Sequence, residues 1–340
     1  MTKKIVISGY YGFGNFGDEA ILAVLLEHLK QFDVEAVVLS KNPRKTSMEY
    51  MVNALNSFDF QQVAELIKQS DILISGGGSL LQDVTSLKSL LYYLWILSLA
   101  LWHKKQVIIF AQGIGPIRNK FAQLLTSLVL KKCTYVSVRD FKSQKLLEWM
   151  GVSSQLLCDP IFSLSFPIEK KCGTVGIQLR DFSTLNDNLL NKLAHQVAKD
   201  FQDKKIELFA LQYEMDFHVC EKFKKMLYTI APNIEVEIVH SLCLPEMLER
   251  ILDVEYMIAM RFHALVVAVK AGIPSVAINY DTKVEKLAQE AKIPVISMNA
   301  SEDFDQVFDN LKNIHDLNLI EYSNSLKFDW SGIDQIISNI

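Results

Sequence analysis

The chain has 340 residues, half of them hydrophobic, which is too long for one ordinary core and suits two domains of about 150 residues each. Its 35 basic and 39 acidic residues give a net charge of −4, so there is no whole-protein positive field and nucleic acid is not an expected partner. The five cysteines form no C-x-x-C pair and are odd in number, which argues against a disulfide framework and a zinc site and indicates a cytoplasmic protein.

Short runs rich in β-branched residues alternate with helical patterns along the chain. The first run, KIVIS, is too short for a signal peptide and is predicted to be the first strand. Continuous apolar strands separated by helices are typical of parallel sheets covered on both faces, so we expect an α/β fold with two doubly wound, Rossmann-like halves. The expected strands are 4–8, 34–40, 71–75, 106–111 and 135–139, then 174–179, 206–211, 236–240, 256–260 and 275–279.

The loop after the first strand matches the dinucleotide-binding spacing G-x-G-x-x-G with Gly12, Gly14 and Gly17. The second strand argues against NAD, because it ends in Ser40 and Lys41, where an acid is needed for the ribose hydroxyl. Lys41 would instead suit the 2′-phosphate of NADP. A dinucleotide-binding role for the loop is therefore less favoured but not excluded.

Two carboxylates, Asp18 and Glu19, fall in the expected first turn of the following helix. There they compete with an incoming phosphate for the positive end of the helix dipole. The loop therefore favours hydroxyls over pyrophosphate. The alternative that Asp18 only caps the helix, and that the glycines only turn the chain, stays open.

A second glycine-rich loop, SGGGSLLQD at 75–83, follows the third strand. Its successive glycines would let a ligand or another backbone approach closely, although glycines after a strand also serve ordinary turns. Next comes the almost wholly apolar segment LLYYLWILSLALW at 90–102, which is too short to span a bilayer. It is either a buried core helix or a helix that touches the membrane surface, with the basic residues up to 105 facing lipid headgroups.

The fourth strand ends in a further glycine-rich loop, AQGIGPI at 111–117, and the fifth strand ends at Arg139, directly before Asp140. An arginine at a strand tip is either an anion-binding fork directed into the cleft or half of a surface ion pair with Asp140 or another acid. Beyond it, residues 163–173 lose periodicity and gather Pro, Lys and Gly, which predicts a linker between the two halves.

The densest group of candidate site residues lies at 256–288, where Arg261 and His263 follow the end of a strand. A helix predicted from about Ala264 places His263 at a helix N-terminus, which lowers the pKa of an imidazole and also binds anions. The position suits a proton donor or acceptor beside a phosphate. An isolated histidine would more often be structural, but Asp281 and Lys283 on the next strand-end loop favour a functional role.

Six motifs occur in order along the chain: GNFGDEAIL, ISGGGSLLQD, AQGIGPI, SVRD, CDPIF and MRFHALVVAVKAGIPSVAINYDTKVEKL. Together they resemble the polysaccharide pyruvyl transferase family over residues from about 5 to 290, and most closely the branch that acts on bacterial cell-wall polysaccharide precursors. The resemblance implies a two-domain, GT-B-like fold with an interdomain cleft. It also implies transfer of pyruvate from phosphoenolpyruvate to a sugar as a cyclic ketal, with release of phosphate.

The resemblance also implies roles for particular residues. Phosphoenolpyruvate would be bound by Arg139, Arg261, His263 and Lys283. We expect His263 to transfer the proton and Asp18, also catalytic, to bind or activate the hydroxyls of the acceptor. The expected acceptor-binding residues are Asn15, Gly17, Asp18, Gly77 and Gly78.

The implied organisation is an acceptor-side domain at 1–165, a donor-side domain at 173–318, and a C-terminal helix at 319–340 that crosses back to the first domain. We expect no metal ion and no cofactor, with phosphoenolpyruvate serving as donor substrate. The acceptor would contain an amino sugar, lipid-linked or free, and the protein would work in the cytoplasm or at the inner face of the membrane, with peripheral contact through 90–105. A GT-B nucleotide-sugar glycosyltransferase and a non-catalytic carbohydrate-binding protein remain as alternatives.

Overall fold

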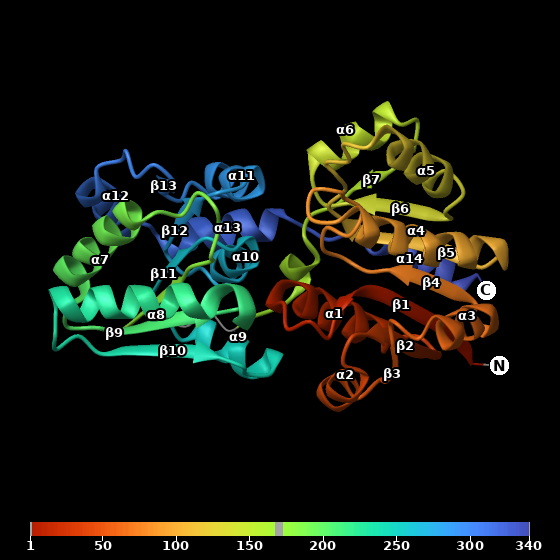
Figure 1. Ribbon diagram of the computed structural model, residues 1–340, viewed down its shortest axis with the longest axis horizontal. Coiled ribbons are helices and arrows are strands. Elements are labelled where there is room, and N and C mark those ends of the chain that lie inside the picture. The colour runs from red at the N-terminus through yellow and green to blue at the C-terminus, as the bar shows by residue number, and fades with distance from the viewer. Residues whose placement is uncertain (1, 167–172, 340) are drawn as a thin grey trace. The chain divides into compact units, whose positions relative to one another are not determined.

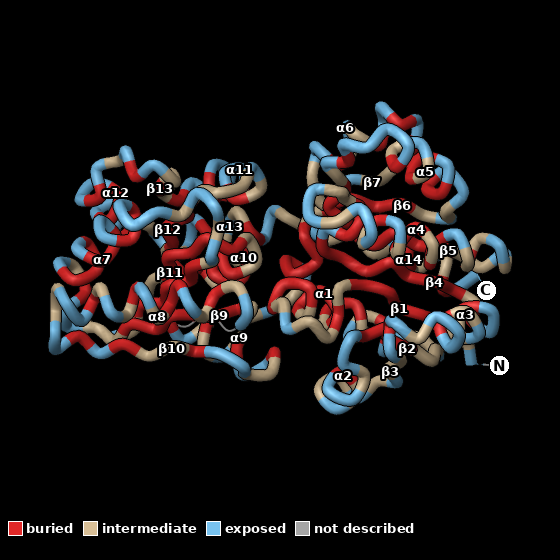
Figure 2. The backbone as a smooth tube through the Cα atoms, viewed as in Figure 1, coloured by how far each residue is buried: buried red, intermediate tan, exposed pale blue. Residues whose placement is uncertain are grey.

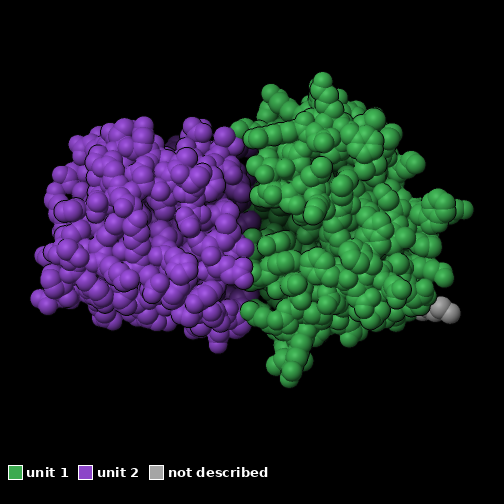
Figure 3. Space-filling model, viewed as in Figure 1, with its two compact units in different colours: residues 1–164, 327–340 green, residues 165–326 purple. Residues whose placement is uncertain are grey.

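The computed structural model describes residues 2–166 and 173–339. The chain forms two compact units, the first comprising Met1–Leu164 and Lys327–Ile340 and the second Ser165–Leu326 (Figures 1 and 3). The change of unit at Leu164 falls within the predicted linker, of which residues 167–172 lie outside the described residues.

Unit 1 is built on a seven-stranded parallel sheet with the order β3-β2-β1-β4-β5-β6-β7. The strand order reverses between the adjacent strands β1 and β4, and such a reversal leaves a crevice beyond their carboxyl ends. The strands are β1 (Lys3–Tyr11), β2 (Val34–Ser40), β3 (Asn53–Asn56), β4 (Ile72–Ser75), β5 (Gln106–Gln112), β6 (Tyr135–Val138) and β7 (Gln155–Leu156). The helices are α1 (Phe16–Leu29), α2 (Pro43–Tyr50), α3 (Phe60–Gln69), α4 (Leu87–Trp102), α5 (Lys120–Leu130), α6 (Phe141–Trp149), the 3₁₀ helix η1 (Pro160–Ser163) and α14 (Ser331–Ser338).

Unit 2 repeats this plan with a six-stranded parallel sheet in the order β10-β9-β8-β11-β12-β13, which reverses between β8 and β11. Its strands are β8 (Thr174–Gln178), β9 (Lys205–Ala210), β10 (Val236–His240), β11 (Tyr256–Ala259), β12 (Ser275–Asn279) and β13 (Val295–Ser297). Its helices are α7 (Asp187–Phe201), α8 (Tyr213–Ile230), α9 (Leu244–Leu252), α10 (Phe262–Lys270), α11 (Thr282–Ala291), α12 (Phe304–Lys312) and α13 (Asp316–Ser325). The predicted fold of two doubly wound parallel-sheet halves is thus confirmed.

Both sheets are covered on their two faces. In β1, the consecutive residues Ile5, Val6 and Ile7 are all fully buried, although their side chains point alternately to opposite faces. The central strands of both units accordingly appear as buried segments in Figure 2. This burial explains why the strands are continuous apolar runs instead of alternating patterns.

The apolar segment 90–102 forms most of α4, and six of its side chains are buried: Leu90, Tyr93, Leu94, Ile96, Leu97 and Ala100. Four others, Tyr92, Trp95, Leu99 and Leu101, are partly exposed and pack against the same core. The segment is therefore mainly a core helix, with Leu91 and Trp102 left exposed. Among the described residues, no helix is both long enough and apolar enough to cross a bilayer.

The end of the chain is divided between the two units. Helix α13 packs on α10 and α11 of unit 2, whereas α14 belongs to unit 1, so the change of unit comes at Lys327, several residues after the predicted boundary at 319. In unit 1, the ring of Trp330 stacks on that of His28 with centroids 3.6 Å apart, and His28 Nε2 lies 2.7 Å from Asp334 Oδ1. The predicted single helix at 319–340 is therefore two helices that serve different cores.

Candidate functional site

The N-terminus of α1, at the crevice of unit 1, is capped by Asn15. The Asn15 side-chain oxygen accepts a hydrogen bond from the Gly17 amide at 3.3 Å, and its side-chain nitrogen donates to Asp18 Oδ2 at 2.6 Å. The alternative that Asp18 caps this helix is therefore wrong. Asp18 is instead a buried carboxylate, 6% exposed, at the carboxyl end of β1.

The loop after β4 packs directly on α1. A Cβ atom added at Gly78 would lie 2.2 Å from Asp18 Oδ1, and one added at Gly77 would lie 2.5 Å from Ile21 Cγ2. Gly78 also has a φ of +87°, which side chains disfavour. The structure thus gathers the predicted residues Asn15, Gly17, Asp18, Gly77 and Gly78. The two glycines make room for α1 itself, and a contact of theirs with a sugar stays a prediction.

Protonated phenols lie close to Asp18. Burial, together with the negative charges of Asp18 and Glu19, raises the pKa of the Tyr11 phenol well above its ordinary value. Burial and Asp18 also raise the pKa of Tyr93. The buried Tyr11 hydroxyl has no hydrogen-bond partner among the described residues. Carboxylates and neutral phenols suit a ligand rich in hydroxyls better than a phosphate.

Arg139 lies in unit 1 and forms a buried ion pair. Its Nη1 lies 2.7 Å from Asp159 Oδ2, and the two side chains are 5% and 2% exposed. Asp140, the other predicted partner, instead caps α6 by accepting the Ser143 amide at 2.8 Å. Arg139 thus forms an ion pair as in the second alternative, but the pair is buried instead of lying at the surface, and the acid lies 20 residues further along the chain. A direct contact of Arg139 with phosphoenolpyruvate stays a prediction.

In unit 2, Arg261 follows β11 and is held by the buried Asp216. Arg261 Nε and Nη2 donate to Asp216 Oδ2 and Oδ1 at 2.7 and 2.6 Å, and Nη2 also donates to Gln212 Oε1 at 3.1 Å. Burial raises the pKa of Asp216, and the attached guanidinium opposes that rise. The guanidinium of Arg261 already binds a protein carboxylate. These contacts favour a positioning role for Arg261 over the predicted role of binding phosphoenolpyruvate directly.

His263 and Lys283 lie at the carboxyl ends of the neighbouring strands β11 and β12. Helix α10 begins at Phe262, slightly earlier than predicted, so His263 is in its first turn as expected. The Phe262 ring contacts both side chains: its centroid is 5.3 Å from that of His263 and 5.9 Å from Lys283 Nζ. Lys283 Nζ also lies 3.8 Å from a carboxylate oxygen of Asp281. The structure thus gathers Arg261, His263 and Lys283 at one edge.

Arg180, just after β8, is a candidate residue that the sequence reasoning missed. Since the strand order reverses between β8 and β11, Arg180 and His263 flank the crevice of unit 2. The guanidinium carbon of Arg180 lies 5.8 Å from the ring centroids of both Phe182 and Tyr280, and its Nη2 contacts Met215 Sδ at 3.7 Å. Its buried Nε has no hydrogen-bond partner, and no ion pair of Arg180 occurs among the residues described.

A sequence signal for Arg180 did exist. The segment IQLRD at 177–181 places an Arg-Asp pair directly after a strand, as SVRD does at 137–140. The first of these arginines keeps donors unused between two aromatic rings, whereas the second, Arg139, is neutralised by Asp159. A cation held in this way can bind a carboxylate or phosphate in two-point fashion.

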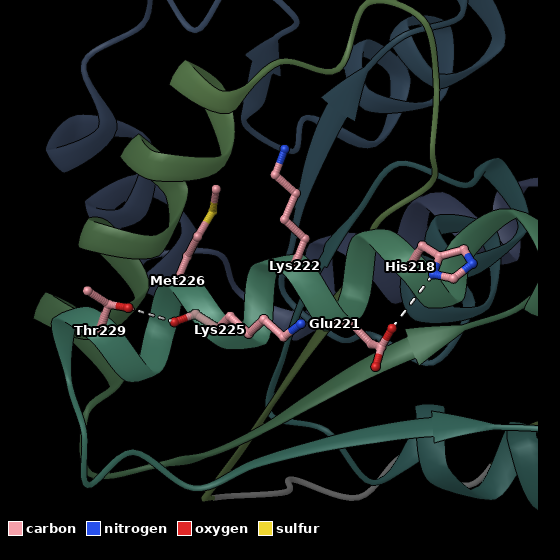
Figure 4. Close-up of a pocket in the computed structure, with 6 residues that line it drawn as sticks. All are labelled: His218, Glu221, Lys222, Lys225, Met226 and Thr229. Carbon is pink, nitrogen blue, oxygen red and sulfur yellow. Dashed lines mark hydrogen bonds and ion pairs between the residues drawn. The ribbon is translucent and has the colours of Figure 1, made fainter.

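A surface depression of about 410 Å³ occurs elsewhere, on α8 (Figure 4). Its lining residues are His218, Glu221, Lys222, Lys225, Met226 and Thr229. All of them come from the exposed side of one helix, away from the carboxyl edge of the sheet, so this depression is not a candidate active site. Within the described part of the chain, no three His, Cys, Asp or Glu side chains gather to hold a metal ion.

The model of the polysaccharide pyruvyl transferase family matches residues 15–282. The chain belongs to the polysaccharide pyruvyl transferase family. Membership supports a transferase that moves pyruvate onto polysaccharide. The matched region includes Arg180, Arg261 and His263 and ends directly before Lys283. A comparison with curated proteins finds no significant match.

Solved structures show the same fold as this member of the pyruvyl transferase family. A putative UDP-N-acetylglucosamine 2-epimerase from Listeria monocytogenes aligns with TM-score 0.66 and 10% identity, over 99% of this chain and 95% of the other. The UDP-GlcNAc 2-epimerase from Neisseria meningitidis, bound to UDP-GlcNAc, aligns with TM-score 0.64 and 10% identity over 100% of both chains. At these identities the likeness establishes the fold alone, which is of the GT-B type.

Proposed function

We propose that this protein transfers pyruvate from phosphoenolpyruvate to a sugar of a cell-wall polysaccharide precursor, forming a cyclic ketal and releasing phosphate. Family membership supports the transfer of pyruvate. The choice of donor rests on the edge formed by β8, β11 and β12, where Arg180, His263 and Lys283 follow three consecutive strands. Phosphoenolpyruvate carries a carboxylate and a phosphate on one small skeleton, and such an edge offers separate cations for two anions.

The proposed reaction assigns proton transfer to His263. One proton is added to the methylene carbon of the donor, and an acceptor hydroxyl attacks the central carbon and loses its own proton. A second hydroxyl then closes the ketal as the carbon–oxygen bond to phosphate breaks, so that phosphate leaves with the bridging oxygen and takes up the proton that the second hydroxyl loses. His263 is the residue of this edge that can give and take protons near neutral pH.

Asp18 is proposed to serve the acceptor. A carboxylate at the carboxyl end of β1, beside Gly78 and near phenols that stay protonated, can accept hydrogen bonds from sugar hydroxyls. Unit 1 would then bind the acceptor and unit 2 the donor. We further propose an amino-sugar acceptor and a location in the cytoplasm or at the inner membrane face, as expected for precursors of this class. The proposed reaction needs no further co-reactant, since donor and acceptor together supply every atom of the products, and we propose no metal ion or cofactor for it.

The decisive experiment measures phosphate release from phosphoenolpyruvate by the full chain, with and without candidate amino-sugar acceptors. The expected result is release that depends on an acceptor, together with a product heavier than the acceptor by one pyruvate less one water. Consumption of a nucleotide sugar in place of phosphoenolpyruvate would support the glycosyltransferase alternative and overturn the proposal. Binding of sugars without turnover of either donor would support a non-catalytic protein.

A further inference from the structure

Helix α5 presents apolar side chains to the outside as well as to the core, where it buries Ala122, Val129 and Leu130. Phe121, Leu124 and Leu128 are 72%, 57% and 52% exposed, and their spacing puts them in one stripe along the helix. On the opposite side, Thr126 and Ser127 are buried, and their hydroxyls donate to backbone oxygens. The outer face of a surface helix in a soluble domain is usually polar. Single exposed apolar residues are ordinary, whereas a continuous stripe marks a contact surface.

Basic residues frame this stripe. Lys120 lies in the first turn of α5, and Arg118 precedes the helix, while Lys131 and Lys132 directly follow it; all four are exposed. The segment between Asp83 and Asp140 contains no acidic residue, although the whole chain has a net charge of −4. Lys120 lies at the positive end of the helix dipole, where a cation destabilises the helix, so its presence there is not explained by helix stability.

We propose that the outer face of α5, with Phe121, Leu124 and Leu128 at its centre, docks on an anionic lipid bilayer. The apolar stripe would enter the boundary between headgroups and acyl chains, and the surrounding cations would pair with lipid phosphates. This inference moves the predicted membrane contact from 90–105, whose apolar side chains are mostly used by the core, to the next helix. It does not rest on the proposed reaction.

Charge favours lipid over a second copy of the chain. A symmetric dimer through this face would bring Arg118, Lys120, Lys131 and Lys132 against the same residues of the partner. Facing like charges oppose such an interface, whereas an anionic bilayer neutralises them. The two components, apolar insertion and charge, can be tested separately.

The test is co-sedimentation of the full chain with vesicles of phosphatidylcholine alone or mixed with phosphatidylglycerol. We expect binding to the mixed vesicles that falls as salt is added, and little binding to the neutral ones. Leu124→Ser/Leu128→Ser should lower the partition coefficient by at least about ten-fold. Lys131→Gln/Lys132→Gln should lower it by about five-fold for each lysine.

Matched controls distinguish binding through the α5 surface from nonspecific hydrophobic or electrostatic binding by other parts of the chain. Met48→Ser/Leu317→Ser removes two apolar side chains that are 70% and 77% exposed on other helices and should bind as the wild type does. Lys222→Gln/Lys225→Gln removes the same charge from α8 and should also have no effect. Wild-type binding by the α5 variants would overturn the proposal, as would equal binding to neutral vesicles. A wild-type dimer that Leu124→Ser/Leu128→Ser dissociates would show that the surface binds a second copy instead.

Discussion

His263 and Arg180 lie at the ends of adjacent strands, but the proposed reaction gives them different tasks. His263, in the first turn of α10, has a ring that can exchange protons, whereas an arginine stays charged at all accessible pH. Substitutions of these two residues should therefore separate kinetically, one affecting chemistry and the other affecting binding.

His263→Gln should lower turnover by about 10² to 10⁴, as is typical when a general acid or base is lost, with a smaller effect on donor affinity. Single-turnover rates and calorimetric binding of phosphoenolpyruvate distinguish the two effects. Normal turnover combined with a collapse of donor binding would mean that His263 is an anion ligand and that the proton comes from elsewhere.

Arg180→Gln should weaken phosphoenolpyruvate binding by roughly 1.5 to 3 kcal/mol, the worth of a charged hydrogen bond. The fold should lose little stability, because the guanidinium forms no ion pair among the described residues and its buried Nε is unsatisfied. Asp216→Asn is the contrasting variant: it leaves Arg261 buried without its counter-charge and should cost about 3 to 5 kcal/mol. Calorimetry and urea denaturation measure both quantities, and a large stability loss in Arg180→Gln would contradict the ligand role.

Glu19 should make stability fall as the pH rises. Burial raises its pKa above 4.5, although its carboxylate accepts hydrogen bonds from the Gly12 amide and the Tyr50 hydroxyl. The folded chain thus binds the Glu19 proton more tightly than the unfolded chain does. The protonated side chain contributes its full stabilisation below the pKa of the unfolded state, and this stabilisation is lost as the pH rises through the pKa of the folded state. Glu19→Gln keeps an acceptor and removes the charge.

The free energy of unfolding of Glu19→Gln, relative to the wild type, should therefore increase from acidic to neutral pH. Urea denaturation of both proteins across that range measures the difference. A difference that shrinks as the pH rises would show that the ionised carboxylate stabilises the fold, contrary to this expectation.

At the scale of elements, the contact between α1 and the loop after β4 sets the position of Asp18. Gly78 and Gly14 both have positive φ values, +87° and +69°, so alanine is strained at either position. They differ in their surroundings: a Cβ atom at Gly78 meets Asp18, whereas one at Gly14 has nothing within 4 Å. Gly14 is therefore a control for backbone strain alone.

Gly14→Ala should cost about 1 to 2 kcal/mol, and Gly78→Ala should cost a further 1 to 3 kcal/mol, roughly, from overpacking against α1. Only the second variant should displace Asp18 and lower the use of acceptor in the transfer assay. Denaturation and acceptor KM measure the two effects, and equal losses in both variants would show that the loop tolerates a side chain beside α1.

At the scale of the whole molecule, the chain returns to its first unit after completing the second. Trp330 stacks on His28 and lies 5.5 Å from the ring of Phe110, and Lys3 Nζ donates to the Ile337 carbonyl at 2.8 Å. The stability of unit 1 thus depends on residues that follow unit 2 in the sequence. Removing them should weaken unit 1 while leaving the core of unit 2 intact.

Trp330→Ala should destabilise unit 1 by about 2 kcal/mol through loss of the stacking contacts of this half-buried ring. Hydrogen exchange resolved by segment should show faster exchange in β1 and β5 and unchanged exchange in β8 and β11. Uniform acceleration in both units would contradict the assignment of α14 to unit 1 alone.

The sequence by itself determined the elements and the family. Runs rich in apolar residues such as 34–40, 236–240 and 275–279 coincide with strands β2, β10 and β12, because the strands of a parallel sheet covered on both faces are mainly apolar. The edge strands β3, β7 and β13 were missed, since they are short and their burial is incomplete. The six ordered motifs identified the family, because loops at the carboxyl edge carry its chemistry.

Only the tertiary structure decided which residues meet. The buried partners of Arg139 and Arg261 lie 20 and 45 residues away in the chain, and no local pattern specifies such pairs. Strand order also depends on how each crossover packs, and this order brings Arg180 beside the crevice that His263 flanks. Helix α5 is apolar on several sides in sequence, and the packing of its inner face alone determined that Phe121, Leu124 and Leu128 point outward.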